Sequence, residues 1–252
     1  MIIKDIYDYI DSFAPFASMC EWDNSGILVG DLNKSVNKIG LALDADSAAI
    51  RAAAESGCDL LITHHPVIFK PLKNISFESG VSKALKAGLS IICAHTNLDK
   101  SAPGTNTALA ELLGLSDNYF PDCDTDAAMC RIGYLKDAIN SLTFSKIISA
   151  KLNTVVKYAD SGRLIKKVAV CGGAGGEFIC DPSLSDIDAF VTGEVKHHEF
   201  IDAKESGISI FSAGHYETEF PVIKMLKNII ETDLQAECVI VNDKAPADYY
   251  GE

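Results

Sequence analysis

Short apolar runs that each end in glycine, histidine or acidic residues recur along this chain and alternate with helical segments. In the first half, the apolar runs 39–43, 60–63 and 89–94 are separated by an alanine-rich helical segment at 47–56 and a second helical segment at 81–87. Short buried strands that alternate with helices are typical of parallel β-α-β units. The pattern therefore predicts an α/β fold with largely parallel sheets.

The same order of segments returns in the second half, with strand-like runs at 168–171, 188–192 and 208–213. The stretch "CDLLITHHP" resembles "IDAFVTGEV", and "AGLSIICAHTNLD" resembles "SGISIFSAGHYETE". Such self-similarity indicates an internal duplication. We expect two α/β halves, residues 1–121 and 122–252, with the C-terminal segment interleaved with the first half and no linker between domains. The less regular stretch 122–160 is expected to connect or extend the halves.

Charge and hydropathy exclude several classes of protein. The 252 residues include 22 Lys and Arg against 35 Asp and Glu, a net charge of −13, which disfavours a general nucleic-acid binder and an anionic membrane surface. Apolar runs fall well short of the roughly 20 residues that a membrane span needs. Residues 2–14 predict an amphipathic helix rather than a signal peptide. Eight scattered cysteines without a CxxC pair favour reduced thiols and a cytoplasmic location.

Histidines gather where the predicted strands end. All six lie at or just after the end of an apolar run: His64, His65, His95, His197, His198 and His215. In open α/β sheets, ligands bind at the carboxyl ends of the strands. Asp99 follows His95 by four residues and Glu219 follows His215 by four, although Pro103 and Gly214 suggest loops there. Histidine combined with carboxylate is typical of sites for zinc, manganese, nickel or iron.

The adjacent histidines add a geometric argument. A regular strand would send His64 and His65 to opposite faces, but a strand that ends before Pro66 can turn both toward one cleft. Two neighbouring imidazoles suit two ions bridged by a carboxylate better than one ion. The alternative is that these histidines cap helices and bond to backbone carbonyls.

Six motifs in order along residues 1–241 support a resemblance to a known family: "CEWDNSGILVGD", "LLITHHPVIF", "CAHTNLDKSAPGTN", "CGGAGG", "VTGEVKHHEF" and "GHYETE". The chain resembles the NGG-interacting-factor-three-like family, whose members are often named GTP cyclohydrolase 1 type 2 homologues. Its length is similar to the short form, without the domain that longer members insert in the middle.

The resemblance implies a dinuclear centre that holds two divalent ions per subunit: zinc, iron, manganese or nickel. By that resemblance His65 and Asp99 hold one ion, His64 and His215 hold the other, and Glu219 bridges them. The resemblance also implies duplicated, intertwined three-layer α/β/α units with metal ligands at strand carboxyl ends. It further implies a homo-oligomer, a ring-like hexamer.

Other residues near the predicted strand ends have two interpretations each. Glu194, His95 and His198 are candidate catalytic residues that exchange protons with a substrate, or they orient the metal ligands. The turn Trp22–Gly26 is either structural or lines a pocket. The run Gly172–Gly176 either cradles a phosphate or allows tight packing of a turn.

These observations predict a metal-dependent hydrolase that acts on a small anionic molecule, possibly a nucleotide. The resemblance implies GTP cyclohydrolase activity. The alternative is a non-catalytic protein that binds or handles metal ions, or a regulatory interaction protein.

Overall fold

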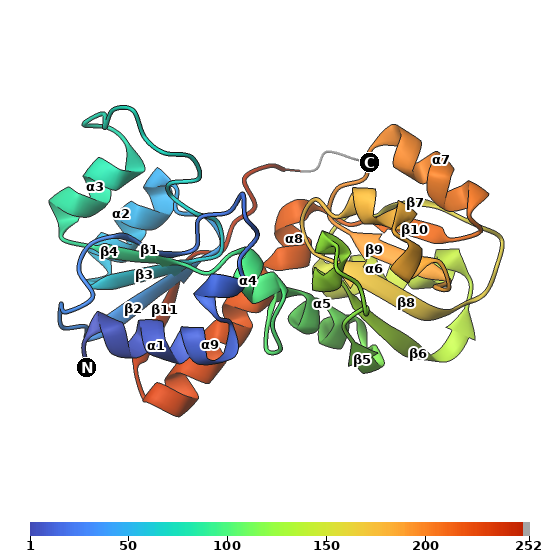
Figure 1. Cartoon of the computed structure of the whole chain (residues 1–252), viewed down its shortest axis with the longest axis horizontal. Helices are drawn as coiled ribbons and strands as arrows, with labels where there is room; N and C mark the ends of the chain where they lie inside the picture. The colour runs from blue at the N-terminus through green and yellow to red at the C-terminus, as the bar shows by residue number, and fades with distance from the viewer. Residues whose placement is uncertain (249–252) are drawn as a thin grey trace. The chain divides into compact units, whose positions relative to one another are not determined.

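The computed structural model describes residues 1–248, which form two compact units (Figure 1). Unit 1 consists of Met1–Pro103 and Val222–Lys244, so the chain leaves it and later returns to it. Unit 2 consists of Gly104–Pro221 and, of the described residues after it, 245–248. The domain division after residue 121 stays a prediction, because compactness alone does not test where independently folding domains end.

Unit 1 is built on a five-stranded sheet in the order β1-β4-β3-β2-β11. Its strands are β1 (Gly26–Val29), β2 (Lys38–Ala42), β3 (Leu60–Thr63), β4 (Ser90–Cys93) and β11 (Glu237–Asn242). All neighbours in this sheet are parallel except β1, which runs antiparallel to β4. Strands β3 and β4 are buried along their whole length, as the continuous apolar runs in the sequence predict.

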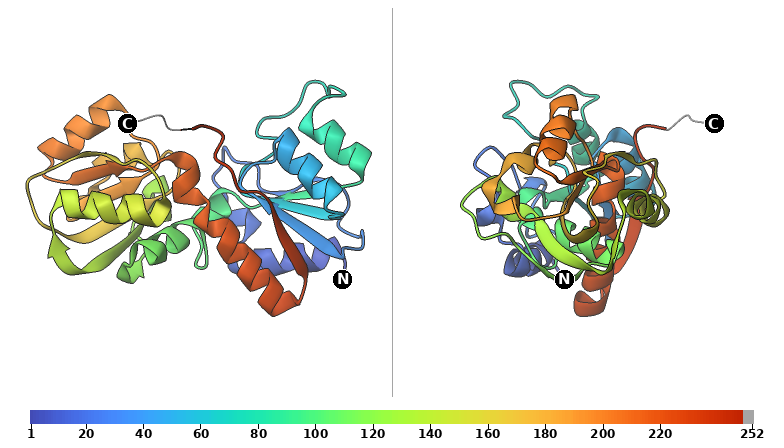
Figure 2. Two further views of the ribbon diagram at one scale, coloured as in Figure 1. Left: turned by 180° about the vertical axis from the view of Figure 1, so that it is seen from behind. Right: turned by 90° about the vertical axis from the view of Figure 1, so that its right-hand side faces the viewer.

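Helices cover both faces of this sheet. One face carries α1 (Ile3–Phe13) and α9 (Pro221–Leu234), and the other carries α2 (Ser47–Glu55) and α3 (Gly80–Ala87) (Figures 1 and 2). The predicted amphipathic helix at the N-terminus is confirmed, since Ile3, Ile6 and Ile10 are fully buried. Helix α2 begins where the Asp46 carboxylate accepts a hydrogen bond from the Ala49 N–H.

Unit 2 is built on a six-stranded sheet in the order β5-β6-β8-β9-β10-β7. Its strands are β5 (Ser116–Tyr119), β6 (Arg131–Ile139), β7 (Lys157–Ala159), β8 (Ile165–Cys171), β9 (Ala189–Thr192) and β10 (Ser209–Ser212). The central strands β8, β9 and β10 are parallel, and the outer strands join them antiparallel. Short 3₁₀ helices lie in the two units at Phe16–Ser18, Asp126–Met129, Gly176–Cys180 and Pro182–Leu184.

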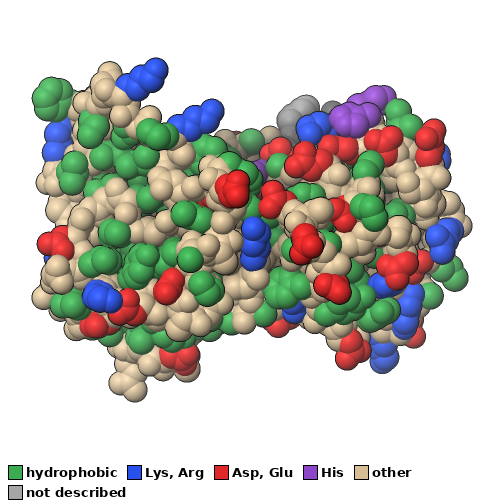
Figure 3. Space-filling model, in the orientation of Figure 1, with side chains coloured by type: hydrophobic (Ala, Val, Ile, Leu, Met, Phe, Trp, Pro, Cys, Tyr) green, Lys and Arg blue, Asp and Glu red, His purple; other side chains and the backbone are tan. Residues whose placement is uncertain are grey.

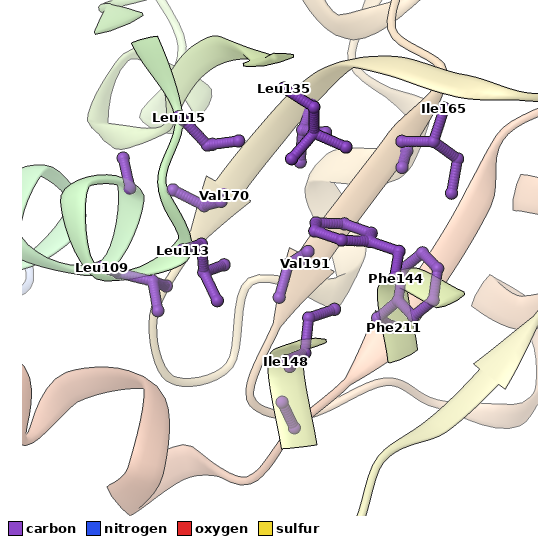
Figure 4. Packing of buried hydrophobic residues seen from close by; sticks show 14 of the residues in the cluster. Leu109, Leu113, Leu115, Leu135, Phe144, Ile148, Ile165, Val170, Val191 and Phe211 are labelled. Carbon is purple, nitrogen blue, oxygen red and sulfur yellow. The ribbon is translucent and has the colours of Figure 1, made fainter. Parts of the chain in front are cut away.

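The core of unit 2 lies between its sheet and two helices, α5 (Thr105–Leu113) and α6 (Ser141–Leu152) (Figure 4). Phe144 of α6 meets Phe211 of β10 edge to face, with ring centroids 5.2 Å apart, and both side chains are fully buried. Helix α7 (His197–Glu205) lies on the other face of the sheet (Figures 1 and 2).

The topology confirms the duplicated α/β fold. Strands β2, β3 and β4 of unit 1 correspond to β8, β9 and β10 of unit 2, because both trios are parallel and an antiparallel strand flanks the last member of each. The stretch 122–160, predicted to connect or extend the halves, contains β6, α6 and β7, and its strands widen the sheet of unit 2. The last four residues of β6 are exposed or half-buried, so its sequence lacks a continuous apolar run. Within residues 1–248, no helix combines the length and apolar character that a membrane crossing requires.

Candidate metal centre

Three histidines converge at the carboxyl ends of β3 and β4 in unit 1. His64 and His65 follow β3, and His95 follows β4. One ring nitrogen from each of the three can be chosen so that all lie within 4.8 Å of one another. The turn before Pro66 therefore brings both adjacent imidazoles to the same cluster, as the sequence predicts.

Each of these imidazoles is oriented by an oxygen that can only accept a hydrogen bond. His65 Nδ1 lies 2.8 Å from Asp44 Oδ1, and His64 Nδ1 lies 3.0 Å from the carbonyl oxygen of Ala94. Since a carboxylate or a carbonyl offers no proton, Nδ1 is the donor in both contacts and the neutral ring presents its lone pair at Nε2. This arrangement is typical of metal-binding histidines, whose second nitrogen is held by a carboxylate or carbonyl.

His95 is held by Asp23, a carboxylate from the "CEWDNSG" turn. The distance from His95 Nδ1 to Asp23 Oδ1 is 2.7 Å, and the Thr96 N–H donates to Asp23 Oδ2 at 3.1 Å. Burial alone raises the pKa of Asp23, but the hydrogen bonds from His95 and Thr96 outweigh it, so the pKa lies well below its usual range. Asp23 is therefore ionised and accepts hydrogen bonds at neutral pH. Because it engages Nδ1 of His95, Nε2 is the ring nitrogen through which His95 can interact with an ion or a substrate.

A carboxylate stands beside the same cluster. Asp99 ends the short helix α4 (Thr96–Asp99), and its Oδ1 lies 3.6 Å from His64 Nε2. Asp99 is only 8% exposed. A nearly buried carboxylate next to an imidazole nitrogen is a favourable setting for a cation, because burying a negative charge is costly without compensation.

Unit 2 places a histidine and two carboxylates together at the end of β10. His215 and Glu219 are the first and last residues of helix α8 (His215–Glu219), so they lie one turn apart, with 3.1 Å between His215 Nε2 and Glu219 Oε2. Glu194, which follows β9, accepts from His215 Nδ1 at 2.8 Å. Glu194 thus orients His215 in the way that Asp44 orients His65.

The four-residue spacings in the sequence are helical turns. Pro103 and Gly214 suggest loops after β4 and β10, but that expectation is wrong, because α4 and α8 form there. Gly214, with φ at +88°, provides the sharp change of direction immediately before α8 rather than a continuing loop.

The glycine run after β8 packs closely against Glu219. A Cβ on Gly173, which has a φ of +64°, would lie 2.2 Å from Glu219 Oε1. The backbone N–H groups of Gly172, Gly173 and Gly175 already donate to side-chain oxygens. These contacts favour tight packing over a phosphate cradle, because the N–H groups that would bind a phosphate are engaged.

The two remaining histidines lie elsewhere on unit 2. His197 and His198 are exposed in the first turn of α7, where histidine side chains reach the surface (Figure 3). Within the described part of the chain, neither belongs to a group of side chains that could hold a metal ion. A catalytic role for His198 stays a prediction.

Sequence reasoning missed the two aspartates that orient imidazoles in unit 1. Asp44 stands directly after a predicted strand, the same position that singled out the histidines, so its place in the sequence was a usable signal. Asp23 and His95 are 72 residues apart, and no spacing rule connects them.

The family model for Duf34/NIF3 (NGG1p interacting factor 3) matches residues 1–246. This chain belongs to the Duf34/NIF3 family. A Duf34/NIF3 relative from Methanocaldococcus jannaschii, named GTP cyclohydrolase 1 type 2 homolog, is 33% identical over 95% of this chain and 98% of its own length. A protein of the same name from Clostridium perfringens is 30% identical over 98% of each chain.

Solved structures show the same fold. Reduced HcgD from Methanocaldococcus jannaschii superposes with a TM-score of 0.84 at 30% identity, covering 96% of this chain and 98% of HcgD. Staphylococcus aureus protein SA1388 superposes with a TM-score of 0.88 at 24% identity, covering 99% of both chains. The Duf34/NIF3 fold therefore extends over nearly the whole chain.

The donor atoms fit a divalent ion of borderline softness. Imidazole nitrogens and carboxylate oxygens, without a thiolate, suit zinc, manganese, iron or nickel. Within this Duf34/NIF3 chain, the three histidines of unit 1 are close enough to hold an ion, and each has the fixed acceptor that metal-binding histidines have.

Proposed function

We propose that this chain is a metal-dependent hydrolase that binds two divalent ions and acts on a small anionic molecule, possibly a nucleotide. The observation that carries the proposal is the shared orientation of four imidazoles. His64, His65, His95 and His215 each donate from Nδ1 to a fixed oxygen, which directs Nε2 to a ligand. Histidines that served unrelated structural roles would not be expected to share this arrangement.

We further propose the ligand set that the resemblance implies: His64, His65, Asp99, His215 and Glu219. The burial of both carboxylates supports it, since Asp99 is 8% exposed and Glu219 is 5% exposed. Bound cations would offset these buried negative charges. The net charge of −13 supports it further, because an anionic substrate approaching such a chain requires a local positive centre.

The chemistry divides between the ions and the protein. When bound, two divalent ions supply Lewis-acid activation of water. In this proposal His95, held by Asp23 and next to His64, exchanges a proton with the substrate through Nε2. The relatives named GTP cyclohydrolase 1 type 2 homolog support nucleotides as the first substrates to try.

Metal content per chain tests the ligand set. We expect two ions in the wild type, loss of one or both in Glu219→Ala, and loss of one in His65→Ala. Elemental analysis of protein purified without chelator or nickel resin measures the ratio. Glu217→Ala, on the same short helix but away from His215 in the helical repeat, is the matched control and should keep both ions. Wild-type metal content in Glu219→Ala would contradict the assignment.

Turnover tests the hydrolase. The metal-loaded chain is incubated with nucleotides and phosphoesters, and products are followed by chromatography. Metal-dependent turnover that is lost in His65→Ala supports the proposal. Ions that pass readily to a chelator, without turnover of any compound, would instead indicate a metal-handling protein.

We also propose that the chain forms a homo-oligomer, a ring-like hexamer as the resemblance implies. Exposed apolar side chains before α3 support an interface, since Phe77 is 80% exposed and Ile75 is 57% exposed. Figure 3 shows hydrophobic side chains reaching the surface over this part of unit 1. Sedimentation velocity measures the assembly, and a single monomeric species across concentrations would contradict it.

A further inference from the structure

The turn that carries Asp23 also carries an exposed tryptophan. Trp22 is 55% exposed although it is a large apolar side chain, and Phe69 beside it is 44% exposed. Their ring centroids are 6.0 Å apart and the rings are inclined by 49°. Both rings also meet the His95 imidazole edge to face, at 6.1 and 6.4 Å between centroids. The aromatic pair Trp22–Phe69 therefore adjoins the histidine cluster of unit 1.

Polar contacts hold the backbone under these rings in place. The Asn24 side chain donates to the carbonyl oxygen of Ile68 at 2.6 Å, which ties the Trp22 turn to the segment of Phe69. Asp23 accepts from the Ser25 hydroxyl and from His95, which ties the same turn to the loop after β4. Exposed rings on a fixed backbone lose little conformational freedom when a ligand binds, so they are prepared for recognition.

We infer that Trp22 and Phe69 form a binding site for a planar aromatic ring of the substrate. This inference rests on the proposed function, because it supplies the part of the substrate that a metal centre does not bind. Two inclined rings with open faces allow a third ring to stack on one and meet the edge of the other, the two arrangements that aromatic pairs favour. The substrate class is thus a planar, aromatic or heteroaromatic ring that carries an anionic group.

A cationic or aliphatic ligand fits these residues less well. Divalent ions at His64 and His65 would repel a cation placed on the neighbouring Trp22 face. An aliphatic chain would use the apolar area but not the paired ring faces. Stacking of a base on an aromatic side chain contributes enough that its removal weakens binding by about tenfold.

The single tryptophan of the chain makes the site directly observable. Trp22 is the only tryptophan, so its fluorescence reports on this position alone. The metal-loaded protein is titrated with guanosine 5′-monophosphate and, as the matched probe without a ring, with ribose 5-phosphate. Excitation at the red edge of the tryptophan band avoids absorption by the base. We expect saturable quenching by the nucleotide and none by the sugar phosphate.

Variants connect the signal to affinity. Trp22→Leu and Phe69→Leu should each weaken nucleotide binding by about tenfold in equilibrium dialysis, whereas Trp22→Phe should retain most of it. Leu85→Ala is the matched control, because Leu85 of helix α3 in unit 1 is 55% exposed like Trp22 but offers no ring for stacking. Equal binding of both probes, unchanged affinity in Trp22→Leu, or binding of tetramethylammonium with the same dependence on Trp22 would overturn the inference.

Metal content and turnover of the same preparations separate the two proposals. Trp22→Leu should keep both ions, because Trp22 contributes no ligand. If the chain binds the nucleotide in a way that depends on Trp22 but turns over no compound, the aromatic binding site is supported and the proposed hydrolase function is rejected. If the wild type turns over a compound and Trp22→Leu binds the nucleotide normally, the hydrolase function is supported and the aromatic binding site is rejected.

Discussion

Asp44 and Asp23 act on the candidate metal centre through the imidazoles that they hold. Asp44 accepts from His65 Nδ1 and Asp23 accepts from His95 Nδ1, so each carboxylate fixes the orientation and the tautomer of a ring. Neither aspartate lies among the proposed ligands. A change at Asp44 therefore tests how much the orientation of the ligand His65 contributes to metal binding, with His65 itself still present.

Asp44→Ala should weaken divalent-ion binding by about 10- to 100-fold without unfolding the chain. Asp44→Asn should weaken it less, because an amide oxygen can still accept from His65 Nδ1. Competition with a chromogenic chelator measures both affinities. Glu55→Ala, an exposed change on helix α2, is the control. Equal affinity in wild type and Asp44→Ala would mean that His65 does not depend on this contact.

Asp23 gives a pH dependence of stability with a definite sign. Its folded-state pKa is depressed below the ordinary value of about 3.9, so its ionised form stabilises the fold above that value. The contribution is lost as the pH falls below about 3.9 toward the folded-state pKa. Urea unfolding should show Asp23→Asn less stable than wild type at pH 7, with the difference shrinking below pH 4. A difference that grew with acid would contradict the assignment.

At the scale of residues, the sequence predicted which side chains lie at the strand ends, but not which hydrogen-bond partners hold them. His64, His65 and His95 lie together because two neighbouring parallel strands, β3 and β4, end at one edge, which the apolar runs already indicated. Asp23 comes from a turn before β1, and its contact with His95 depends on how that turn folds over the sheet. Such a contact depends on tertiary packing, so no periodic pattern in the sequence predicts it.

At the scale of elements, continuous apolar runs that end at glycine predicted the central strands of both sheets. The edge strands were not predicted. Strand β5 is exposed along most of its length, and β7 has only three residues, so neither contains a run of buried apolar side chains. The central strands are buried on both faces and read as apolar throughout. Strands are therefore hard to predict from apolar runs where one face or one edge of the strand is exposed to solvent.

The loop after β8 makes a prediction at the same scale. Gly173→Ala should displace Glu219 and lower the metal content, because the new Cβ would lie 2.2 Å from Glu219 Oε1. Gly57→Ala is a matched control, since its φ of +72° is similar but no atom lies within 4 Å of its Cβ. Both changes should cost about 1 kcal/mol from left-handed backbone strain. Equal metal content in the two variants would show that Glu219 tolerates the displacement.

At the scale of the whole molecule, each unit has a core of its own. Ile91 lies in the core of unit 1, with side chains of α2 and α3, and Ile148 lies in the core of unit 2, with Phe144 and Phe211. Unit 1 also needs two separate stretches of chain, because β11 pairs with β2 to complete its sheet. The order of segments along the sequence therefore does not tell whether the two units unfold independently or as one cooperative structure.

Matched core substitutions answer that question. Ile91→Val and Ile148→Val each remove one methylene from a fully buried side chain, and such a change costs about 0.5–1.5 kcal/mol. If each core governs its own unit, Ile148→Val should speed amide exchange in β8, β9 and β10 by about two- to tenfold and leave β2, β3 and β4 unchanged. Ile91→Val should do the opposite. Hydrogen exchange followed by mass spectrometry resolves the two sheets. Equal acceleration in both sheets by either variant would show that the two cores unfold as one cooperative structure.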